Sequence, residues 1–291
     1  MSARVQDTVR VGWGFAAPGL TMLAIVIGLP LFYAAAISVS SMTLLKPDLH
    51  LTGFGNFAQI ISEPLFWNSL WITLRYSIAA VTGEFVVGLS IALMLRQVVA
   101  LRGIYFAVLT LPMAMSPVAV ALIWRMLLQP NLGIVNKTLA SVGLPMIDWL
   151  GNPDLALKTM IFIDIWQQTS FVVLLLSAGL ASLPREHYEA AEVDGAGTFQ
   201  QFWYITLPLL RPVSMIAIVI QLINEFRTYD LIYVLTKGGP GISTELLSFF
   251  AYKRAFQGLA VNEGNAAAFI LLLIVLSITV VFFYLLEQRK S

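Results

Sequence analysis

Apolar residues dominate six stretches of this chain, and each stretch is long enough to cross a membrane as a helix. The stretches cover residues 13–40, 68–95, 104–128, 156–182, 213–236 and 265–286. About 20 apolar residues in a helix cross roughly 30 Å of hydrocarbon. Turn-rich polar segments separate them, and one opens with the chain-reversal signal Gly238-Gly239-Pro240-Gly241. The pattern predicts an all-α polytopic membrane protein with six transmembrane helices.

Composition agrees with this class and excludes several others. Of the 291 residues, 58% are hydrophobic and 11% are charged, whereas soluble domains carry about 25% charged residues. The absence of cysteine excludes disulfide frameworks, thiolate zinc sites and thiol catalysis. Basic residues are scattered, so we expect no nucleic-acid partner. We find no internal repeat and no linker, and we expect residues 1–291 to form a single transmembrane domain.

Six crossings place both termini on the same side of the membrane. Eight Lys and Arg residues fall on that side and six on the other, and those on the first side flank the spans closely, as Arg10, Arg289 and Lys290 do. Positive charges close to span ends favour the cytoplasmic side. This predicts that both termini are cytoplasmic. The first apolar stretch is too long for a signal-peptide core, so we interpret it as a retained helix.

A polar loop at about residues 184–212 interrupts this apolar pattern. Pro184 suits a first helical turn and Gly195 suits a helix stop, which predicts a short helix over residues 184–194. Thr198 and Gln201 fit the spacing of a capping box for a second short helix. Leu207-Pro208 is expected to end this unit before the next span begins.

The first of these short helices is thin and acidic. Ala190, Ala191 and Ala196 carry small side chains, and a thin helix can enter a groove on a partner protein. The alternative is a helix that rests on lipid, but such helices are usually basic. Docking to a partner is therefore the favoured interpretation.

Charged residues inside the spans are the second unusual feature, because charge at membrane depth is costly and faces the bundle interior or a water-filled cavity. These residues are Arg75, Glu84, Arg125, Asp164, Glu225, Arg227 and Asp230. Gln221, Asn224, Glu225 and Thr228 follow the spacing i, i+3, i+4, i+7 and share one helix face. Gln167, Gln168 and Phe171 lie on the preceding span. Carboxamides suit sugar hydroxyls because each offers donors and an acceptor, and rings such as Trp166 and Phe171 suit the C–H face of a sugar.

Two interpretations of these polar residues stay open, contact with cargo and packing between helices. Buried Gln, Asn and Thr also hold helices together at about 0.6–2 kcal/mol per contact. For the four-residue stripe we favour contact with cargo, and for Arg75, Glu84 and Arg125 we favour helix packing. His50 and His187 are expected in loops, exposed to solvent.

The loop residues Glu189-Ala190-Ala191, Gly195 and Ile205-Thr206-Leu207-Pro208 resemble the loop motif of ABC-importer permeases. Motifs along nearly the whole chain resemble the carbohydrate-uptake branch, of the maltose-transporter (MalF) and UgpA-like type. These motifs are Phe54-Gly55-Asn56-Phe57, Phe66-Trp67-Asn68-Ser69, Leu111-Pro112, Trp124, Gly133-Ile134-Val135-Asn136 and Leu235-Thr236-Lys237-Gly238-Gly239-Pro240.

The resemblance implies a type I ABC-importer permease whose loop is a coupling helix seated in a cleft of a cytoplasmic ATPase. The implied coupling residues are Glu189, Ala190, Ala191, Asp194, Gly195, Leu207 and Pro208. The implied sugar-lining positions are Asp164, Gln167, Gln168, Phe171, Gln221, Asn224, Glu225 and Thr228. Several of these differ in type from a maltose-like pattern, which favours a different sugar, a polyol, a sugar acid or a glycerol-phosphate-type ester.

The resemblance also implies partners and a location. The partners are a second permease in a heterodimer, two ATPase subunits, and a periplasmic or lipid-anchored solute-binding protein. ATP and Mg would sit on the ATPase, with no cofactor or metal on this chain, and the location would be the bacterial cytoplasmic (inner) membrane.

Motifs for catalysis are missing from the sequence. There is no G-x-x-x-x-G-K-[ST] for ATP phosphates, and no H-E-x-x-H or G-x-S-x-G for hydrolysis. The energy for transport must then come from a partner or an ion gradient. An ion-coupled secondary transporter that uses Asp164, Glu225 and Asp230 is the alternative. Inverted repeats or broken helices would favour it, and the sequence indicates neither. An intramembrane enzyme is the least favoured hypothesis.

Overall fold

The computed structural model describes residue 13 and residues 15–97 and 101–287. In this part of the chain the regular structure is helical, apart from an isolated bridge between Ser40 and Leu51. The all-α prediction is confirmed. Arg10, Arg289 and Lys290 of the charge argument lie outside the described residues.

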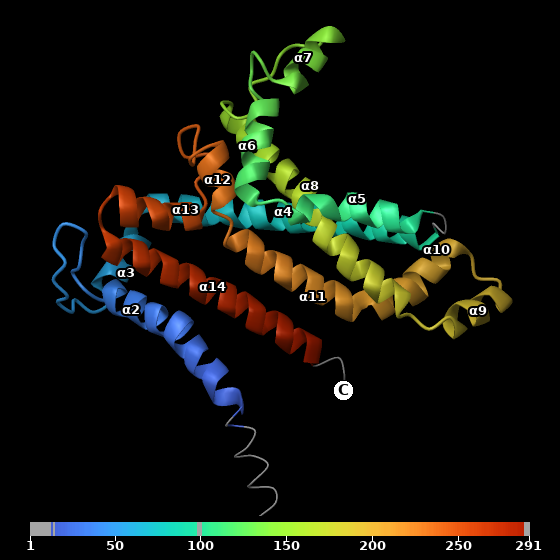
Figure 1. The fold of residues 1–291 in the computed structure, drawn as a ribbon, viewed down its shortest axis with the longest axis horizontal. Helices are drawn as coiled ribbons and strands as arrows, with labels where there is room; N and C mark the ends of the chain where they lie inside the picture. Colours follow the sequence, from blue (N-terminus) through green and yellow to red (C-terminus); the bar gives the residue numbers. More distant parts are fainter. Residues whose placement is uncertain (1–12, 14, 98–100, 288–291) are drawn as a thin grey trace, which may run out of the picture. The chain divides into compact units, whose positions relative to one another are not determined.

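Helices follow one another along nearly the whole described chain (Figure 1). Their bounds are α2 (Leu29–Ser38), α3 (Gly55–Ser62), α4 (Pro64–Gln97), α5 (Arg102–Ala114), α6 (Pro117–Leu127), α7 (Ile134–Ser141), α8 (Pro153–Ala181), α9 (Glu186–Val193), α10 (Thr198–Gln201), α11 (Leu207–Phe226), α12 (Asp230–Leu235), α13 (Leu247–Tyr252) and α14 (Val261–Glu287). Segments Ala24–Gly28, Phe202–Thr206 and Lys253–Gln257 are π-helical.

Five helical stretches are long and apolar enough to cross a membrane, and the number is six if one bent pair of helices is counted as a single span. The five are Phe15–Ser38, Pro64–Gln97, Pro153–Ala181, Thr198–Phe226 and Val261–Tyr284. The third predicted span, 104–128, is not one helix, because α5 and α6 meet at a bend of 94°. Pro117 begins α6, and a residue before proline is disfavoured in the α region. Ser116 is accordingly extended, with ψ 135°.

The fifth predicted span, 213–236, is shifted toward the N-terminus. The sequence predicts that Leu207-Pro208 ends the polar loop before the next span begins. This prediction is wrong, because one helix runs from Thr198 to Phe226. In the π-helical segment, the Leu207 N–H bonds the Phe202 carbonyl five residues back. Pro208 follows this wide turn near the start of α11, where its missing N–H interrupts little. The helix instead breaks after Phe226, and α12 is separate.

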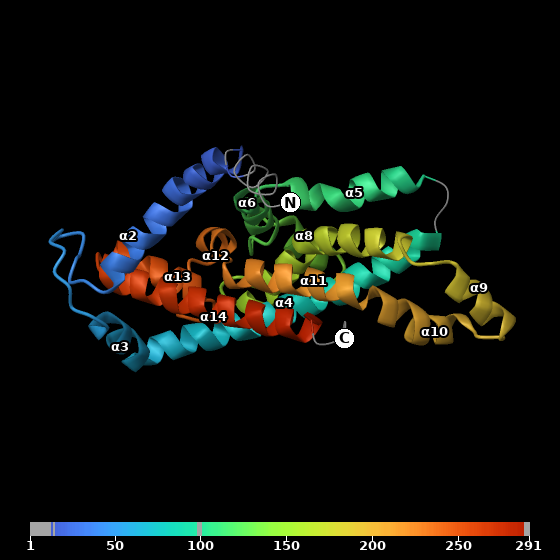
Figure 2. The same cartoon turned by 90° about the horizontal axis from the view of Figure 1, so that it is seen from below.

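One compact unit comprises Leu65–Phe250 and Leu271–Ser291. Within it, α8 lies beside α4 (Figure 2). Glycines allow close approach to both neighbouring helices: a Cβ added to Gly88 of α4 would lie 2.7 Å from Val172 Cγ1 of α8, and one added to Gly179 of α8 would lie 2.9 Å from Leu210 Cδ1 of α11. Buried apolar residues fill the space between these helices: Ala92, Val172, Leu176, Leu180 and Leu210. Three spans are thereby packed against one another around one core.

The other unit comprises Met1–Pro64 and Ala251–Ile270. The Asn56 amide donates to the carbonyls of Ser38 at 2.8 Å and Ser40 at 2.7 Å, and its oxygen accepts from Asn262 Nδ2 at 3.0 Å. Arg254 pairs with both Glu63 and Glu263. The asparagine of the Phe54-Gly55-Asn56-Phe57 motif therefore serves to hold its segment together.

Asn136 has a similar role in the first unit. Its amide donates to the carbonyls of Pro130 at 3.0 Å and Ile147 at 2.8 Å, and its oxygen accepts from Trp149 Nε1 at 3.1 Å. The side chain thus closes the turn-rich segment between α6 and α8.

Candidate functional site

A polar cavity of about 390 Å³ lies where α8 meets the end of α11. Five of the eight predicted cargo residues line it: Asp164, Gln167, Gln168, Asn224 and Thr228. Arg227, Tyr229, Asp230, Pro117 and Leu231 complete the lining. The two spans that the polar loop joins therefore do bring their polar faces together.

The predicted stripe on α11 is continuous. Asn224 Nδ2 donates to Gln221 Oε1 at 3.1 Å, and Thr228 Oγ1 donates to the Asn224 carbonyl at 3.3 Å. Because α11 ends at Phe226, Thr228 lies in the break before α12 rather than inside a helix. The break adds backbone groups beside the cavity, which irregular chain at membrane depth can do where it lines a cavity.

Gln167 connects the cavity to the bend between α5 and α6. Its Nε2 donates to the Met115 carbonyl at 3.2 Å. Met115 precedes the extended Ser116, so this carbonyl has no helical partner ahead of it. The bond satisfies the Met115 carbonyl, which would be costly to leave without a hydrogen bond in apolar surroundings.

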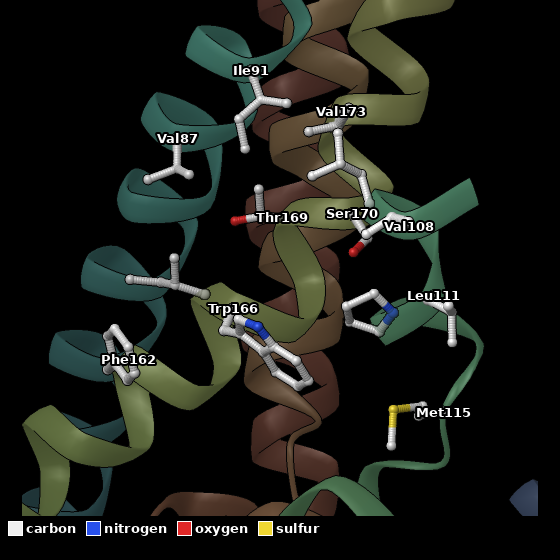
Figure 3. A pocket seen from close by; sticks show the side chains of 13 residues that line it. Val87, Ile91, Val108, Leu111, Met115, Phe162, Trp166, Thr169, Ser170 and Val173 are labelled. Carbon is white, nitrogen blue, oxygen red and sulfur yellow. The ribbon is translucent and has the colours of Figure 1, made fainter. Parts of the chain in front are cut away.

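The remaining predicted residues lie elsewhere. Gln221 and Glu225 are buried and do not line the cavity. Phe171 is half-buried and also absent from the lining. Trp166 lines a different, apolar pocket of about 590 Å³, together with Phe162, Met115 and side chains of α4 and α5 (Figure 3). A stacking role for Trp166 in the polar cavity therefore does not follow from its position.

An acidic cluster lies beside the cavity. Glu84 of α4, Asp164 of α8 and Glu225 of α11 each contribute a carboxylate oxygen, and these oxygens all lie within 4.8 Å of one another. Glu84 and Glu225 are fully buried, and Asp164 is 6% exposed. Among the described residues, this is the set of carboxylates that could share a cation, since carboxylate oxygens suit hard cations.

Each carboxylate of the acidic cluster accepts a hydrogen bond from a neutral donor. Tyr76 Oη donates to Asp164 Oδ2 at 2.8 Å, and Gln221 Nε2 donates to Glu84 Oε2 at 2.7 Å. Thr228 Oγ1 lies 3.4 Å from Glu225 Oε2. These bonds offset part of the cost of burying three acidic groups together. They also tie α4, α8 and α11 to one another.

Little in the sequence indicates the acidic cluster. Glu84 is a charge at membrane depth, and its separation from Asp164 and Glu225 along the chain gives no hint of contact. The favoured packing role for Glu84 agrees with its place between helices. Arg125, also assigned to packing, donates to the Val234 carbonyl at 3.0 Å, and Arg75 lies 4.7 Å from the Trp71 ring centre.

The polar loop forms the expected short helix and turn. α9 covers Glu186–Val193, and Gly195 follows with φ +76°, a left-handed conformation that suits glycine. The Ala196 N–H bonds the Ala191 carbonyl at 2.8 Å and closes the turn. α9 and α10 lie at the opposite end of α11 from α12 (Figure 1). His187, expected in a loop, is an exposed residue of α9.

The predicted capping box is wrong by one residue. Gly197 caps α10, and its N–H donates to Gln200 Oε1 at 3.0 Å. Gln201 instead donates from Nε2 to the Ala196 carbonyl at 3.2 Å. Of the other predicted coupling residues, Glu189, Ala190, Asp194 and Pro208 are exposed, and Ala191 and Leu207 are half-buried.

Membrane-crossing helices around a polar cavity, with a small exposed helix at one end, define a membrane transport protein. The family of binding-protein-dependent transport system inner membrane components matches residues 84–290. The chain belongs to this family.

Similar proteins of known kind agree with this assignment. The chain is 35% identical over 282 residues to the trehalose/maltose transport system permease protein MalF of Thermococcus litoralis, covering 97% of this chain and 95% of that protein. It is 33% identical over 279 residues to the sn-glycerol-3-phosphate transport system permease protein UgpA of Yersinia pseudotuberculosis, covering 94% and 92%. A chain of the bacterial alginate ABC transporter, solved with an alginate pentasaccharide-bound periplasmic protein, has a TM-score of 0.85 at 23% identity and covers 98% of each chain.

Proposed function

We propose that this chain is a non-catalytic permease subunit that passes a sugar or sugar-like solute through the polar cavity between α8 and the end of α11. The observation that carries the proposal is the convergence of Gln167, Gln168, Asn224 and Thr228 on one cavity. Amides and hydroxyls bind the donors and acceptors of a polyol without requiring charge. Relatives that carry trehalose and maltose or glycerol 3-phosphate support this class of cargo.

The proposed assembly supplies what this chain lacks. A second permease would complete the passage, and residues 1–291 would act as one permease domain within it. Two ATPase subunits would bind ATP and Mg, and a periplasmic or lipid-anchored solute-binding protein would deliver the cargo. The chain would lie in the bacterial cytoplasmic membrane with both termini in the cytoplasm.

In this proposal α9 is the coupling helix. Glu189, Ala190, Ala191, Asp194 and Gly195 form the part that enters the ATPase, and Leu207 and Pro208 join it to α11. Closure of the ATPase dimer on ATP would pull on α9, and the attached spans would open the cavity outward. Hydrolysis would return it to the inward-facing state.

Replacing the cavity amide of Gln168 tests the cargo site. We expect Gln168→Leu to lower ATP-driven uptake by about tenfold, since one lost hydrogen bond to cargo is worth about 1.4 kcal/mol. Uptake and basal ATP hydrolysis would be measured on the complete transporter in proteoliposomes. Thr110→Val is the control, because Thr110 lies on α5 and bonds only its own helix. Full uptake by Gln168→Leu would remove this residue from the passage.

Gly195 tests the coupling helix. Its φ is +76° and no atom lies within 4 Å of an added Cβ, so a Trp side chain would project from the α9 turn toward a partner. We expect Gly195→Trp to assemble and to lose uptake driven by ATP. Gly143 has φ +79° and equally open surroundings, so Gly143→Trp imposes the same backbone strain away from α9. Unchanged uptake by an assembled Gly195→Trp transporter would refute the coupling role.

An ion-coupled secondary transporter is the second candidate. The bend between α5 and α6 and the acidic cluster favour it, because broken helices and buried acids are typical of such proteins. Membership of a binding-protein-dependent family favours the ATP-driven form instead. Uptake by this chain alone in vesicles without ATP would decide for the ion-coupled form.

A further inference from the structure

α9 has little of its own surface buried. None of its residues is buried, although Tyr188 is half-buried. Along the chain, residues 182–185 join α9 to α8, and the turn at Gly195 joins it to α10. A helix held so loosely can move the spans through these chain connections and through the few groups that it contacts.

Tyr188 reaches from α9 to two other helices. The Arg96 guanidinium carbon lies 4.4 Å from the centre of the Tyr188 ring, which is a cation–π contact. The Tyr188 hydroxyl lies 3.0 Å from Thr206 Oγ1. The Thr206 hydroxyl also donates to the Gln201 carbonyl at 3.3 Å, so the contact extends into the π-helical segment.

The two contacted residues stand at the ends of two spans. Arg96 is in the last turn of α4, about three turns after Glu84. Thr206 is buried and directly precedes α11, which carries Gln221 and Glu225. One side chain therefore joins α9 to both helices that flank α8 in the acidic cluster.

The surroundings of Tyr188 are open. A groove of about 570 Å³, lined by Leu93, Glu192 and Phe202 among others, lies beside the Tyr188 ring. Side chains pack tightly around Gly88, whereas Tyr188 is held by a few direct contacts beside an open groove. Such contacts can transmit a displacement while the groove leaves room for rotation.

We propose that Tyr188 is the positioning residue that carries movement of the coupling helix into α4 and α11 together. The inference rests on the proposed coupling role of α9 and names the group that performs it. Each contact carries part of the movement, since the ring holds α4 through Arg96 and the hydroxyl holds α11 through Thr206.

The experiment measures the number of cargo molecules imported per ATP hydrolysed by the complete transporter in proteoliposomes. We expect Tyr188→Leu to lower this ratio about fivefold or more, within the usual range of coupling between sites, while assembly and basal hydrolysis persist. Tyr188→Phe keeps the ring and should give a smaller loss, and Arg96→Lys should retain more coupling than Arg96→Gln. The control is Tyr204→Leu, since Tyr204 is 79% exposed.

A double variant separates transmission from a general structural role. Since Arg96 acts through the Tyr188 ring, Arg96→Gln combined with Tyr188→Leu should be no worse than Tyr188→Leu alone. Fully additive losses, or an unchanged ratio in Tyr188→Leu, would overturn the inference. If Gly195→Trp uncouples the transporter while Tyr188→Leu does not, only the role of Tyr188 fails. If neither variant uncouples it, the coupling role of α9 fails as well.

Discussion

Asp164 takes part in two environments at once. Its carboxylate belongs to the acidic cluster with Glu84 and Glu225, and the residue also lines the polar cavity with Gln168 and Asn224. Changes in the cavity can therefore reach the contacts between α4, α8 and α11 through a single side chain. This gives the intramembrane acids a role in holding the spans together, and it places Asp164 at the cavity that is proposed for cargo.

The hydrogen bond from Tyr76 to Asp164 allows a prediction about stability at the residue scale. Tyr76→Phe removes the hydroxyl that donates to Asp164 Oδ2 at 2.8 Å and leaves a buried acceptor unpaired. We expect a loss of about 1–3 kcal/mol in stability, measured as a lower temperature of thermal unfolding for the purified protein in detergent.

Glu84→Gln is the matched comparison for Tyr76→Phe. It removes one of three neighbouring acidic groups, keeps the side-chain shape, and leaves an oxygen to accept from Gln221 Nε2. Its unfolding temperature should equal or exceed that of the unchanged protein, because one fewer ionisable group is buried in the cluster. A larger loss for Glu84→Gln than for Tyr76→Phe would contradict this account of the cluster.

Single residues were predictable where local spacing determines their place. Gln221, Asn224 and Thr228 were read as one face from helical periodicity, and they do contact one another. The acidic cluster was not predictable, because its three members come from three spans and no local pattern links Glu84 to Asp164. The position of Trp166 was missed for the same reason, since neighbouring residues of α8 face different pockets.

At the scale of elements, proline and glycine explain both the correct and the wrong predictions of where helices end. Gly195 marked the end of α9 correctly, because a positive φ at a helix end favours glycine. The apolar pattern places Pro117 inside a span, yet it begins a new helix after a 94° bend. The sequence predicts a stop at Pro208, yet the π-helical turn before it lets the helix continue into α11. A proline permits either outcome, and the surrounding hydrogen bonds decide between them.

Close packing between α4 and α8 gives the prediction at this scale. A Cβ on Gly88 would meet Val172 Cγ1 at 2.7 Å, and Val172 is a stiff, buried, β-branched residue. We expect Gly88→Ala to cost about 1–3 kcal/mol through overpacking, read from thermal unfolding.

The same substitution at Gly103 serves as the control for Gly88→Ala. Among the described residues, nothing lies within 4 Å of a Cβ added there, so Gly103→Ala should be neutral or stabilising by up to about 1 kcal/mol, as expected for alanine in a helix. Equal effects at the two positions would argue against close packing of α4 on α8.

At the scale of the whole molecule, the proposed sites of energy input and cargo passage lie at different ends of the same helix. α9 lies at one end of α11, and the polar cavity lies at the other. Family membership identifies a transport component, and ATP is proposed to bind a partner subunit. The central claim is that nucleotide on the partner changes the side from which the cavity is open.

Because the chain contains no cysteine, a single Thr228→Cys substitution tests this claim directly. Thr228 lines the cavity, and a membrane-impermeant maleimide would be added to either side of proteoliposomes that hold the complete transporter. The account predicts labelling from the outside when ATP is trapped on the partner, and from the inside without nucleotide. Labelling from the same side in both states would contradict it.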